Sequence, residues 1–406
     1  MNRKLSVVLP SGGQLTEYFF SQSLLSVAND LSIEFISQLS KEILRSPEFR
    51  PYPELMAMGF WMRKHHIEEI LNKHISESGD KIRLPRGVVF HIAPSNVDTI
   101  FVYSWLLSML MGNINIVRLS SKGGIQINLL LKLLNNLLKK SKYKDIASRQ
   151  LLITYERDSK VTSYLSAHCD TRVIWGGDDT VNTIRKFPIP PAATDLVFPD
   201  KFSISLIGVS KFENLDENSK IKLVKSFIND AFWFGQMACS SPRLILWLGN
   251  SELIEETKKD FWARVDDLLD VDFAKISTAD IVNKLVTSHS LAINSNINII
   301  KTKNNLVNRI NLYSLEKMDT NLHCGGGLFY EFSIEQLGDM IPFVSRKIQT
   351  IGYFGVMEEE IKQFITEHTP KGIDRFVPIG EALDFSPIWD GYNFLYEFTR
   401  TVDVKS

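Results

Sequence analysis

The sequence is poor in cysteine and has no excess of charge of either sign. Its 406 residues include three cysteines, Cys169, Cys239 and Cys324, with no C-x-x-C pair among them. Because so few thiols cannot staple a chain of this length, the sequence predicts a reducing, cytoplasmic compartment. Lys and Arg number 46 against 47 Asp and Glu, a net charge of −1. The basic surface expected of a nucleic-acid-binding protein is therefore missing.

Long hydrophobic runs are also scarce. The apolar stretch that follows Arg3 and Lys4 is too short for a signal peptide. Residues 99–117 carry no charged side chain over about the length of a membrane span. Gly112 and Asn113 interrupt this stretch, so we expect a buried helix, a turn and a buried strand, and no membrane span.

What is present is an alternation of strand-like and helix-like segments. Residues up to about Gly79 indicate helices with a turn at Pro51–Pro53. From Arg86 onward, short β-type runs are separated by segments with apolar residues at helical spacing. The expected strands are Val88–Ile92, Ile114–Leu119, Leu151–Tyr155 and Thr171–Trp175. This pattern predicts an α/β protein with parallel β-α-β units and a doubly wound sheet.

Cys239 lies in a segment that favours covalent chemistry. Small and polar residues surround it between a helical pattern and the strand 244–247. In such a turn, backbone N–H groups can lower a thiol pKa and stabilise negative charge. The alternative reading is a small buried hydrophobic residue.

Two further turns follow predicted strands. Asn96, in Pro94-Ser95-Asn96, can offer its amide to an oxyanion at the edge of the sheet, or can simply be a turn residue. Gly176 and Gly177 allow a pyrophosphate to approach a helix N-terminus. Asp178 and Asp179 would cap that helix equally well without a ligand.

Taken together, these motifs resemble the aldehyde dehydrogenase superfamily, and most closely its LuxC-like acyl-CoA reductases, the fatty-acid reductase component of bacterial luminescence. The likeness extends from about Gly87 to Gly391. The segments that carry it are Pro94-x-Asn96, Gly112-Asn113 with Arg118, Ile174–Asp178, Gly235-Gln236, Ala238–Pro242, Gln349–Gly352, Asp374–Gly380 and Trp389–Gly391.

The resemblance implies roles for individual residues. Cys239 matches the nucleophile of the family, and Asn96 matches the donor that holds the oxyanion alongside the Cys239 N–H. Gly176 and Gly177 match the turn near the cofactor pyrophosphate.

The resemblance also implies a nicotinamide cofactor, and a second set of residues favours NADPH. Arg118 stands where most aldehyde dehydrogenases carry a lysine that holds the adenosine ribose. Ser121 stands where NAD-preferring members often carry glutamate, and Lys122 is adjacent to it. A carboxylate there would repel a 2′-phosphate, whereas these side chains can bind one. The alternative is that they are solvated residues after a strand.

The expected reaction is the reduction of an acyl thioester to an aldehyde through a Cys239 acyl-enzyme. The segment Ser205–Val209 corresponds in this reading to the family's Glu-Leu-Gly-Gly, and it has no carboxylate to activate water. Reduction of an acyl phosphate is the enzymatic alternative. A non-reducing acyl-carrier or scaffold subunit of an acyl-activating complex is the other.

The expected organisation has three parts. Residues 1–207 form N-terminal helices and the NADP-binding domain, residues 208–370 the catalytic domain, and residues 371–406 a segment that packs back or makes oligomer contacts. The expected partners are an acyl-CoA or an acylated carrier protein, an acyl-protein synthetase-like subunit, and further copies of the chain. Neither His65 and His66 with His74, nor His323 beside Cys324, has the spacing of a structural zinc site, so no metal is predicted.

Overall fold

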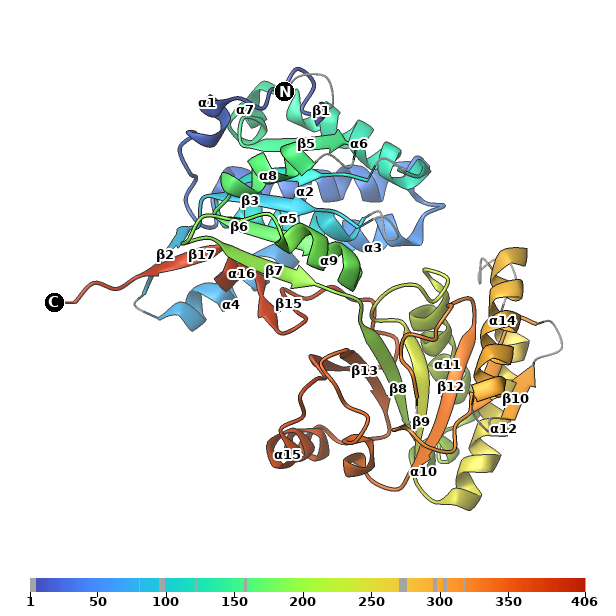
Figure 1. The fold of residues 1–406 in the computed structure, drawn as a ribbon. Coiled ribbons are helices and arrows are strands. Elements are labelled where there is room, and N and C mark those ends of the chain that lie inside the picture. Colours follow the sequence, from blue (N-terminus) through green and yellow to red (C-terminus); the bar gives the residue numbers. More distant parts are fainter. Residues whose placement is uncertain are drawn as a thin grey trace. The chain divides into compact units, whose positions relative to one another are not determined.

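The computed structural model describes residues 5–79, 81–94, 99–120, 123–156, 159–269, 276–294, 298–301, 305–316 and 318–405 (Figure 1). The chain divides into two compact units, Met1–Pro199 with Phe385–Ser406, and Asp200–Asp384. We call them the first and the second unit. The division precedes the expected boundary at 207/208, because residues 202–208 pair with strands of the second unit.

The first unit is built on a six-stranded sheet of order β1-β5-β4-β3-β6-β7. Its strands are β1 (Leu5–Leu9), β3 (Val88–Ile92), β4 (Ile114–Arg118), β5 (Gln150–Tyr155), β6 (Thr171–Trp175) and β7 (Thr194–Phe198). All neighbours are parallel except β1, which runs antiparallel to β5. The strand order reverses between β3 and β6, as in a doubly wound fold. The predicted parallel sheet is therefore confirmed.

The prediction that the chain is helical up to Gly79 is wrong at its start. Leu5–Leu9 form β1, which pairs with the edge of β5 from Leu5 opposite Tyr155 to Leu9 opposite Leu152. Hydrogen bonding to an open sheet edge is a tertiary effect, and a five-residue segment gives little local signal for it.

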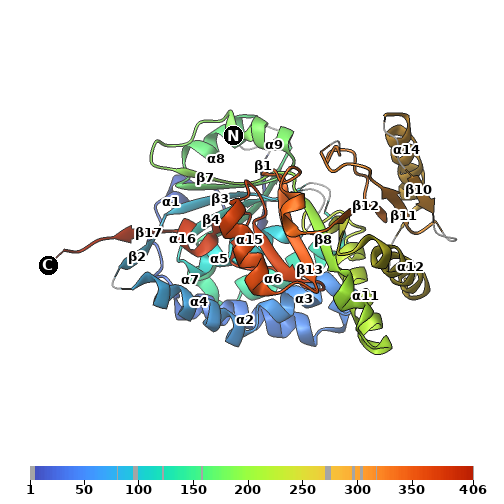
Figure 2. The ribbon, with the colours of Figure 1, turned by 90° about the horizontal axis from the view of Figure 1, so that it is seen from below.

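Helices cover both faces of this sheet (Figure 2). Two of these helices contribute apolar residues to a core cluster that also contains Phe90 and other strand residues. One helix contributes Val161 and Leu165, and the other contributes Val181 and Ile184. These helices are α8 (Ser159–Ala167) and α9 (Asp178–Arg185). The other helical elements of the unit are α1 (Glu17–Phe20), α2 (Asp30–Arg45), η1 (Pro47–Phe49), α3 (Pro53–Trp61), α4 (Lys64–Ser78), α5 (Ile100–Leu110), α6 (Ile125–Leu138), η2 (Ser141–Tyr143), α7 (Lys144–Ala147) and α16 (Phe394–Glu397).

Residues 99–117 form the expected helix, turn and strand. Helix α5 is almost entirely buried and ends at Leu110, and β4 begins at Ile114. Within the described part of the chain, none of the helices combines the length and the hydropathy that a bilayer crossing needs.

Two short strand pairs complete the first unit. Strand β2 (Ile82–Pro85) pairs antiparallel with β17 (Thr399–Val402), and the pair projects from this unit in Figures 1 and 2. Strand β15 (Ile388–Trp389) pairs with β16 (Tyr392–Asn393). Trp389 is buried and stacks on Phe385, so the Trp389-Asp390-Gly391 motif forms a packed turn.

The second unit contains a seven-stranded sheet of order β10-β11-β12-β9-β8-β13-β14. The strands are β8 (Phe202–Gly208), β9 (Pro242–Leu248), β10 (Asn298–Lys301), β11 (Asn308–Asn311), β12 (Leu328–Ile334), β13 (Ile348–Phe354) and β14 (Arg375–Pro378). Pairing is parallel throughout except between β10 and β11. The starts of β8, β9 and β13 therefore lie at the same edge of the sheet.

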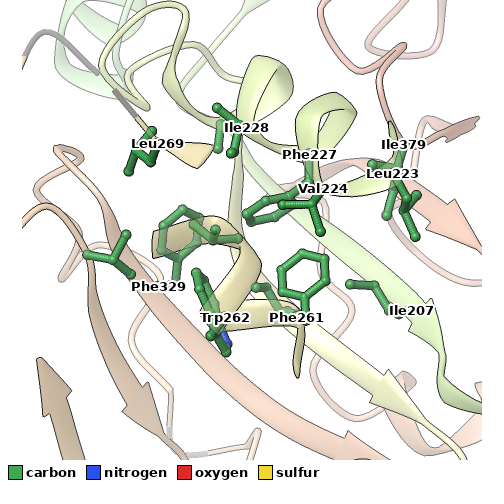
Figure 3. Packing of buried hydrophobic residues seen from close by; sticks show 14 of the residues in the cluster. Ile207, Leu223, Val224, Phe227, Ile228, Phe261, Trp262, Leu269, Phe329 and Ile379 are labelled. Atoms are coloured by element: carbon green, nitrogen blue, oxygen red, sulfur yellow. The ribbon is translucent and has the colours of Figure 1, made fainter. Parts of the chain in front are cut away.

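Two clusters of buried side chains hold this unit together. In one, Phe227 of α11 (Glu217–Phe232) and Phe261 and Trp262 of α12 (Ser251–Leu268) pack with Phe329 of β12 (Figure 3). The second cluster contains Leu291 of α14 (Thr278–Asn294) and Phe364 of α15 (Glu358–His368). The other helical elements among the described residues of this unit are α10 (Val209–Glu213) and η3 (Leu337–Met340). Burying aromatic side chains of this size gives each helix about 1.5–3 kcal/mol per residue of favourable transfer free energy.

Candidate active site

Cys239 lies in the loop between α11 and β9, at the edge of the second sheet where β8, β9 and β13 begin. We call residues 233–241 the cysteine loop. Cys239 is half-buried, and its backbone carbonyl accepts a hydrogen bond of 2.7 Å from the Ser203 hydroxyl on β8. The Ser241 hydroxyl donates to the backbone carbonyl of Asp230 on α11 at 2.8 Å. The loop is thus tied to the strand and to the helix beside it, which agrees with the turn predicted for this segment.

Gln236 fixes the shape of the cysteine loop. Its backbone is left-handed, with φ at 64°, a conformation that a non-glycine residue adopts only at some energetic cost. The fully buried amide offsets this cost through three hydrogen bonds. Its Nε2 donates to the carbonyls of Pro242 and Leu328 at 2.9 Å each, and its Oε1 accepts from the Gly327 N–H at 2.9 Å. The glutamine of the Gly-Gln motif therefore fixes the backbone of the cysteine loop to β9 and β12.

Gly325–Gly327 form a packed support for the cysteine loop. The Gly326 N–H donates to the Gly235 carbonyl at 2.9 Å. All three glycines have positive φ, and a Cβ on Gly327 would lie 2.1 Å from the Leu306 carbonyl oxygen. Only glycine allows this close approach.

The Cys239 sulfur accepts a hydrogen bond from the Gln349 amide Nε2 at 3.3 Å. Gln349 is 1% exposed and lies near the start of β13. Sequence reasoning placed Gln349 in a family-like segment but assigned it no role. The polar pair Gln349-Thr350 inside an apolar segment was the available signal, but the strand pairing was needed to bring it to Cys239.

Arg243 of β9 and His323, which precedes β12, are the basic side chains considered for the electrostatics around Cys239. Arg243 is 6% exposed, and burial lowers its pKa, while the charges of Asp200 and Cys239 oppose that shift. Attraction to Cys239 means that the guanidinium favours the thiolate. Burial, followed by the charge of Arg243, holds the pKa of His323 well below its usual range, so His323 is neutral at pH 7.

The segment Ser205–Val209 follows β8 away from the cysteine loop. Strand β8 pairs Ser203 with Pro242, next to the cysteine loop, but Gly208 with Leu248 at the far end of β9. Five residues of strand separate the two positions, about 17 Å.

The cofactor candidates lie in the first unit. Arg118 ends β4, and Gly176 and Gly177 follow β6, so they meet at the carboxyl edge of the sheet on either side of β3. The guanidinium of Arg118 lies 4.8 Å over the Tyr155 ring, and its buried Nε has no hydrogen-bond partner among the described residues. A Cβ added to Gly177 would meet nothing within 4 Å. Asn96, Ser121 and Lys122 lie outside the described residues.

Two further observations on the described residues bear on ligand and metal binding. A surface hollow of about 550 Å³ is lined by Ser159, Lys160, Ser163, Tyr164 and Phe187, none of them a predicted site residue. In the part of the chain that is described, no three His, Cys, Asp or Glu side chains are placed to hold a metal ion.

Solved structures define the class of fold. Aldehyde dehydrogenase 21 from Physcomitrella patens, solved with succinate, matches with a TM-score of 0.67 and 10% identity over 92% of this chain and 85% of its own. A 3,6-anhydro-L-galactose dehydrogenase in complex with NADP matches with a TM-score of 0.62 and 11% identity, covering 92% of this chain and 85% of its own. The protein therefore has an aldehyde dehydrogenase-like fold.

The family is defined by sequence. Residues 65–401 match the model of the acyl-CoA reductase (LuxC) family, and the chain belongs to this family. A curated relative, the long-chain acyl-protein thioester reductase of Aliivibrio fischeri, is 25% identical over 175 residues, which are 41% of this chain and 33% of the relative. The matched region thus spans about a third of that relative's length. The family and fold expected from the sequence motifs are confirmed.

Proposed function

We propose that this protein reduces an acyl thioester to an aldehyde with NADPH, through an acyl-enzyme formed on Cys239. The observation that carries the proposal is the placement of Cys239 in a rigid loop, with a buried amide donating to its sulfur, in a member of the acyl-CoA reductase family. A hydrogen bond to sulfur favours the thiolate, which is the nucleophilic form.

In the first half-reaction, the Cys239 thiolate attacks the carbonyl carbon of the thioester. Asn96 and the Cys239 backbone N–H stabilise the negative charge that develops on the oxygen. The bond to the departing thiol then breaks, that thiol takes up a proton, and the acyl group remains on Cys239.

In the second half-reaction, the acyl carbon of the acyl-enzyme is reduced. A reduced nicotinamide, when bound, supplies the hydride. The carbon–sulfur bond then breaks, the electron pair returns to Cys239 as thiolate, and the aldehyde is released.

The first unit has features that fit a dinucleotide. Ligands of open α/β sheets bind at the carboxyl edge where the strand order reverses, and here that point lies between β3 and β6. Arg118 offers a buried donor without a partner in the described residues, which suits a phosphate oxygen. Gly177 leaves room for a pyrophosphate at the start of α9. Asp178 and Asp179 add negative charge at the same turn, but both are exposed and so are screened by salt.

Arg118, Ser121 and Lys122 support NADPH over NADH, because none of these side chains is negatively charged and so none would repel a 2′-phosphate. The substrate would be an acyl-CoA or an acylated carrier protein, and the Aliivibrio fischeri relative, a long-chain acyl-protein thioester reductase, supports a long acyl chain. An acyl-protein synthetase-like subunit and a homo-oligomer, both in a cytoplasmic setting, complete the proposal.

The test is a turnover assay that follows nicotinamide absorbance with a panel of acyl-CoA chain lengths. We expect the wild type to oxidise NADPH and form aldehyde, and Cys239→Ala to do neither. Asn96→Ala should lower kcat about 10²–10³-fold with little change in KM, as expected for one oxyanion donor. Cys169→Ala is the matched control, because Cys169 is buried in the first unit and burial raises its pKa to about 12.

Each alternative has its own outcome in this assay. Turnover with an acyl phosphate but not with acyl-CoA would indicate an acyl-phosphate reductase. Acylation of Cys239 without nicotinamide oxidation would indicate an acyl carrier. Undiminished turnover by Cys239→Ala would contradict the proposal.

A further inference from the structure

A chain of three hydrogen bonds ends at the Cys239 sulfur. In each bond, the donor belongs to the residue farther from the sulfur and the acceptor to the next residue toward it. Arg375 Nε donates to Thr350 Oγ1 at 2.9 Å, Thr350 Oγ1 donates to Gln349 Oε1 at 3.3 Å, and Gln349 Nε2 donates to Cys239 Sγ at 3.3 Å. A guanidinium thus stands at one end and a thiol at the other. Every member of the chain lies in the second unit.

The middle of this chain is fixed by its surroundings. Thr350 is 0% exposed and Gln349 is 1% exposed, so water cannot replace their bonds easily. The Thr350 N–H donates to Ser203 Oγ, which in turn donates to the Cys239 carbonyl. Because the Thr350 hydroxyl accepts from Arg375, its proton is directed to Gln349 Oε1. The Gln349 amide is then obliged to present its NH₂ group to the sulfur.

We propose that Gln349 and Thr350 are positioning residues that transmit the positive charge of Arg375 to Cys239 and hold the sulfur as a thiolate. Hydrogen bonds in a chain polarise one another, and the effect is larger where the surroundings are dry. A stabilised thiolate helps twice, since a larger fraction of Cys239 is ionised for attack, and the thiolate also leaves more readily when the carbon–sulfur bond breaks. This inference rests on the proposed role of Cys239 as nucleophile.

Other charged groups face this region and have to be separated from the chain. Arg243 of β9 also favours the thiolate, while His323 is neutral at pH 7. Asp230 of α11 accepts hydrogen bonds from the N–H groups of Gly380 and Ala382 at 2.6 and 3.1 Å, and burial raises its pKa to about 7. Asp384 and Arg375 act on that carboxyl in opposite directions. None of these groups is altered by the substitutions below.

The test measures the pH profile of Cys239 alkylation by iodoacetamide, followed by mass spectrometry of the Cys239 peptide in the full chain. Gln349→Leu removes the donor at similar volume and should raise the apparent pKa of the thiol by about one unit, so that the thiolate fraction at neutral pH falls by up to about tenfold and alkylation slows about three- to fourfold. Gln349→Glu places a carboxylate there and should raise it further. Thr350→Val breaks the link to Arg375 and should raise it by about half a unit.

Two variants separate this effect from mere packing. Thr350→Ser keeps the hydroxyl and should have the same pH profile of alkylation as the wild type. Ser203→Ala removes the bond to the Cys239 carbonyl and should lower stability without moving the thiol pKa. Arg375 is a poorer target, because it also donates to the carbonyls of Ala382 and Asp384. The thermal midpoint of each variant reports whether it has folded.

Wild-type alkylation profiles for both Gln349→Leu and Thr350→Val, in folded protein, would overturn the inference. A shift in Thr350→Ser as large as that in Thr350→Val would do the same. The alkylation assay needs neither cofactor nor acyl substrate. If the wild type shows no reductase activity but the variants shift the thiol pKa as expected, the proposed function alone is contradicted. If the wild type is active but the variants leave the alkylation profile unshifted, this inference alone is contradicted.

Discussion

At the scale of single residues, buried polar side chains account for most of what the site can do. Gln236 and Gln349 are buried amides at the cysteine loop, one holding the backbone and the other donating to the sulfur. An unsatisfied buried amide would cost about 1–3 kcal/mol, so each is retained for the partners that it finds. Arg118 differs from both, because its buried Nε has no partner among the described residues.

Replacing Arg118 should therefore affect cofactor use more than stability. We expect Arg118→Met to lower kcat/KM for NADPH about ten- to a hundredfold, the value of a charge-assisted hydrogen bond of about 1.5–3 kcal/mol. The loss with NADH should be smaller, because NADH lacks the 2′-phosphate. Steady-state kinetics with both cofactors measures this. Ser121→Glu should shift the preference toward NADH by repulsion, and equal losses with both cofactors in Arg118→Met would contradict a 2′-phosphate role.

At the scale of elements, the parallel strands of the first unit and the turns that follow them were predictable. Val88–Ile92 and Thr171–Trp175 coincide with β3 and β6, because a short, mostly apolar run rich in β-branched and aromatic residues is typical of a strand buried on both faces. Strand β1 was missed, since its stability comes from the edge of β5. The contact between Gln349 and Cys239 was equally hidden, because 110 residues separate them and only the pairing of β13 with β8 brings them together.

The turn between β6 and α9 allows a test at this scale. Gly177 has φ at −62°, and a Cβ there would meet nothing within 4 Å, so Gly177→Ala should leave stability almost unchanged. If a pyrophosphate packs against this backbone, the added methyl group should raise KM for the cofactor about tenfold or more. Thr183→Ala, at an exposed position of the same helix, is the control and should change neither quantity. Unaltered cofactor KM in Gly177→Ala would place the pyrophosphate elsewhere.

At the scale of the whole molecule, the candidate residues are divided between the two units. The cofactor candidates Arg118, Gly176 and Gly177 belong to the first unit, and Cys239 with its hydrogen-bond chain belongs to the second. Because each unit has its own sheet and core, the stability of each can be probed through a group that the proposed chemistry does not use. His91 is such a group in the first unit.

His91 should make the first unit sensitive to mild acid. It lies on β3, is 0% exposed, and its ring contacts Asn115 Oδ1 at 3.0 Å and Ser104 Oγ at 3.3 Å. Burial lowers the pKa of His91 from 6.5 to about 4. Between these two values the unfolded chain binds a proton that the folded chain does not, so stability is retained above pH 6.5 and is lost as the pH falls toward 4. From pH 7 to pH 5 the loss should be about 2 kcal/mol.

Urea unfolding between pH 7 and pH 5 measures this loss of stability, and His91→Gln should flatten the pH dependence by that amount. His65→Gln, on the exposed face of α4, should follow the wild type. A wild type and a His91→Gln variant with the same pH dependence would show that His91 is already protonated in the folded protein.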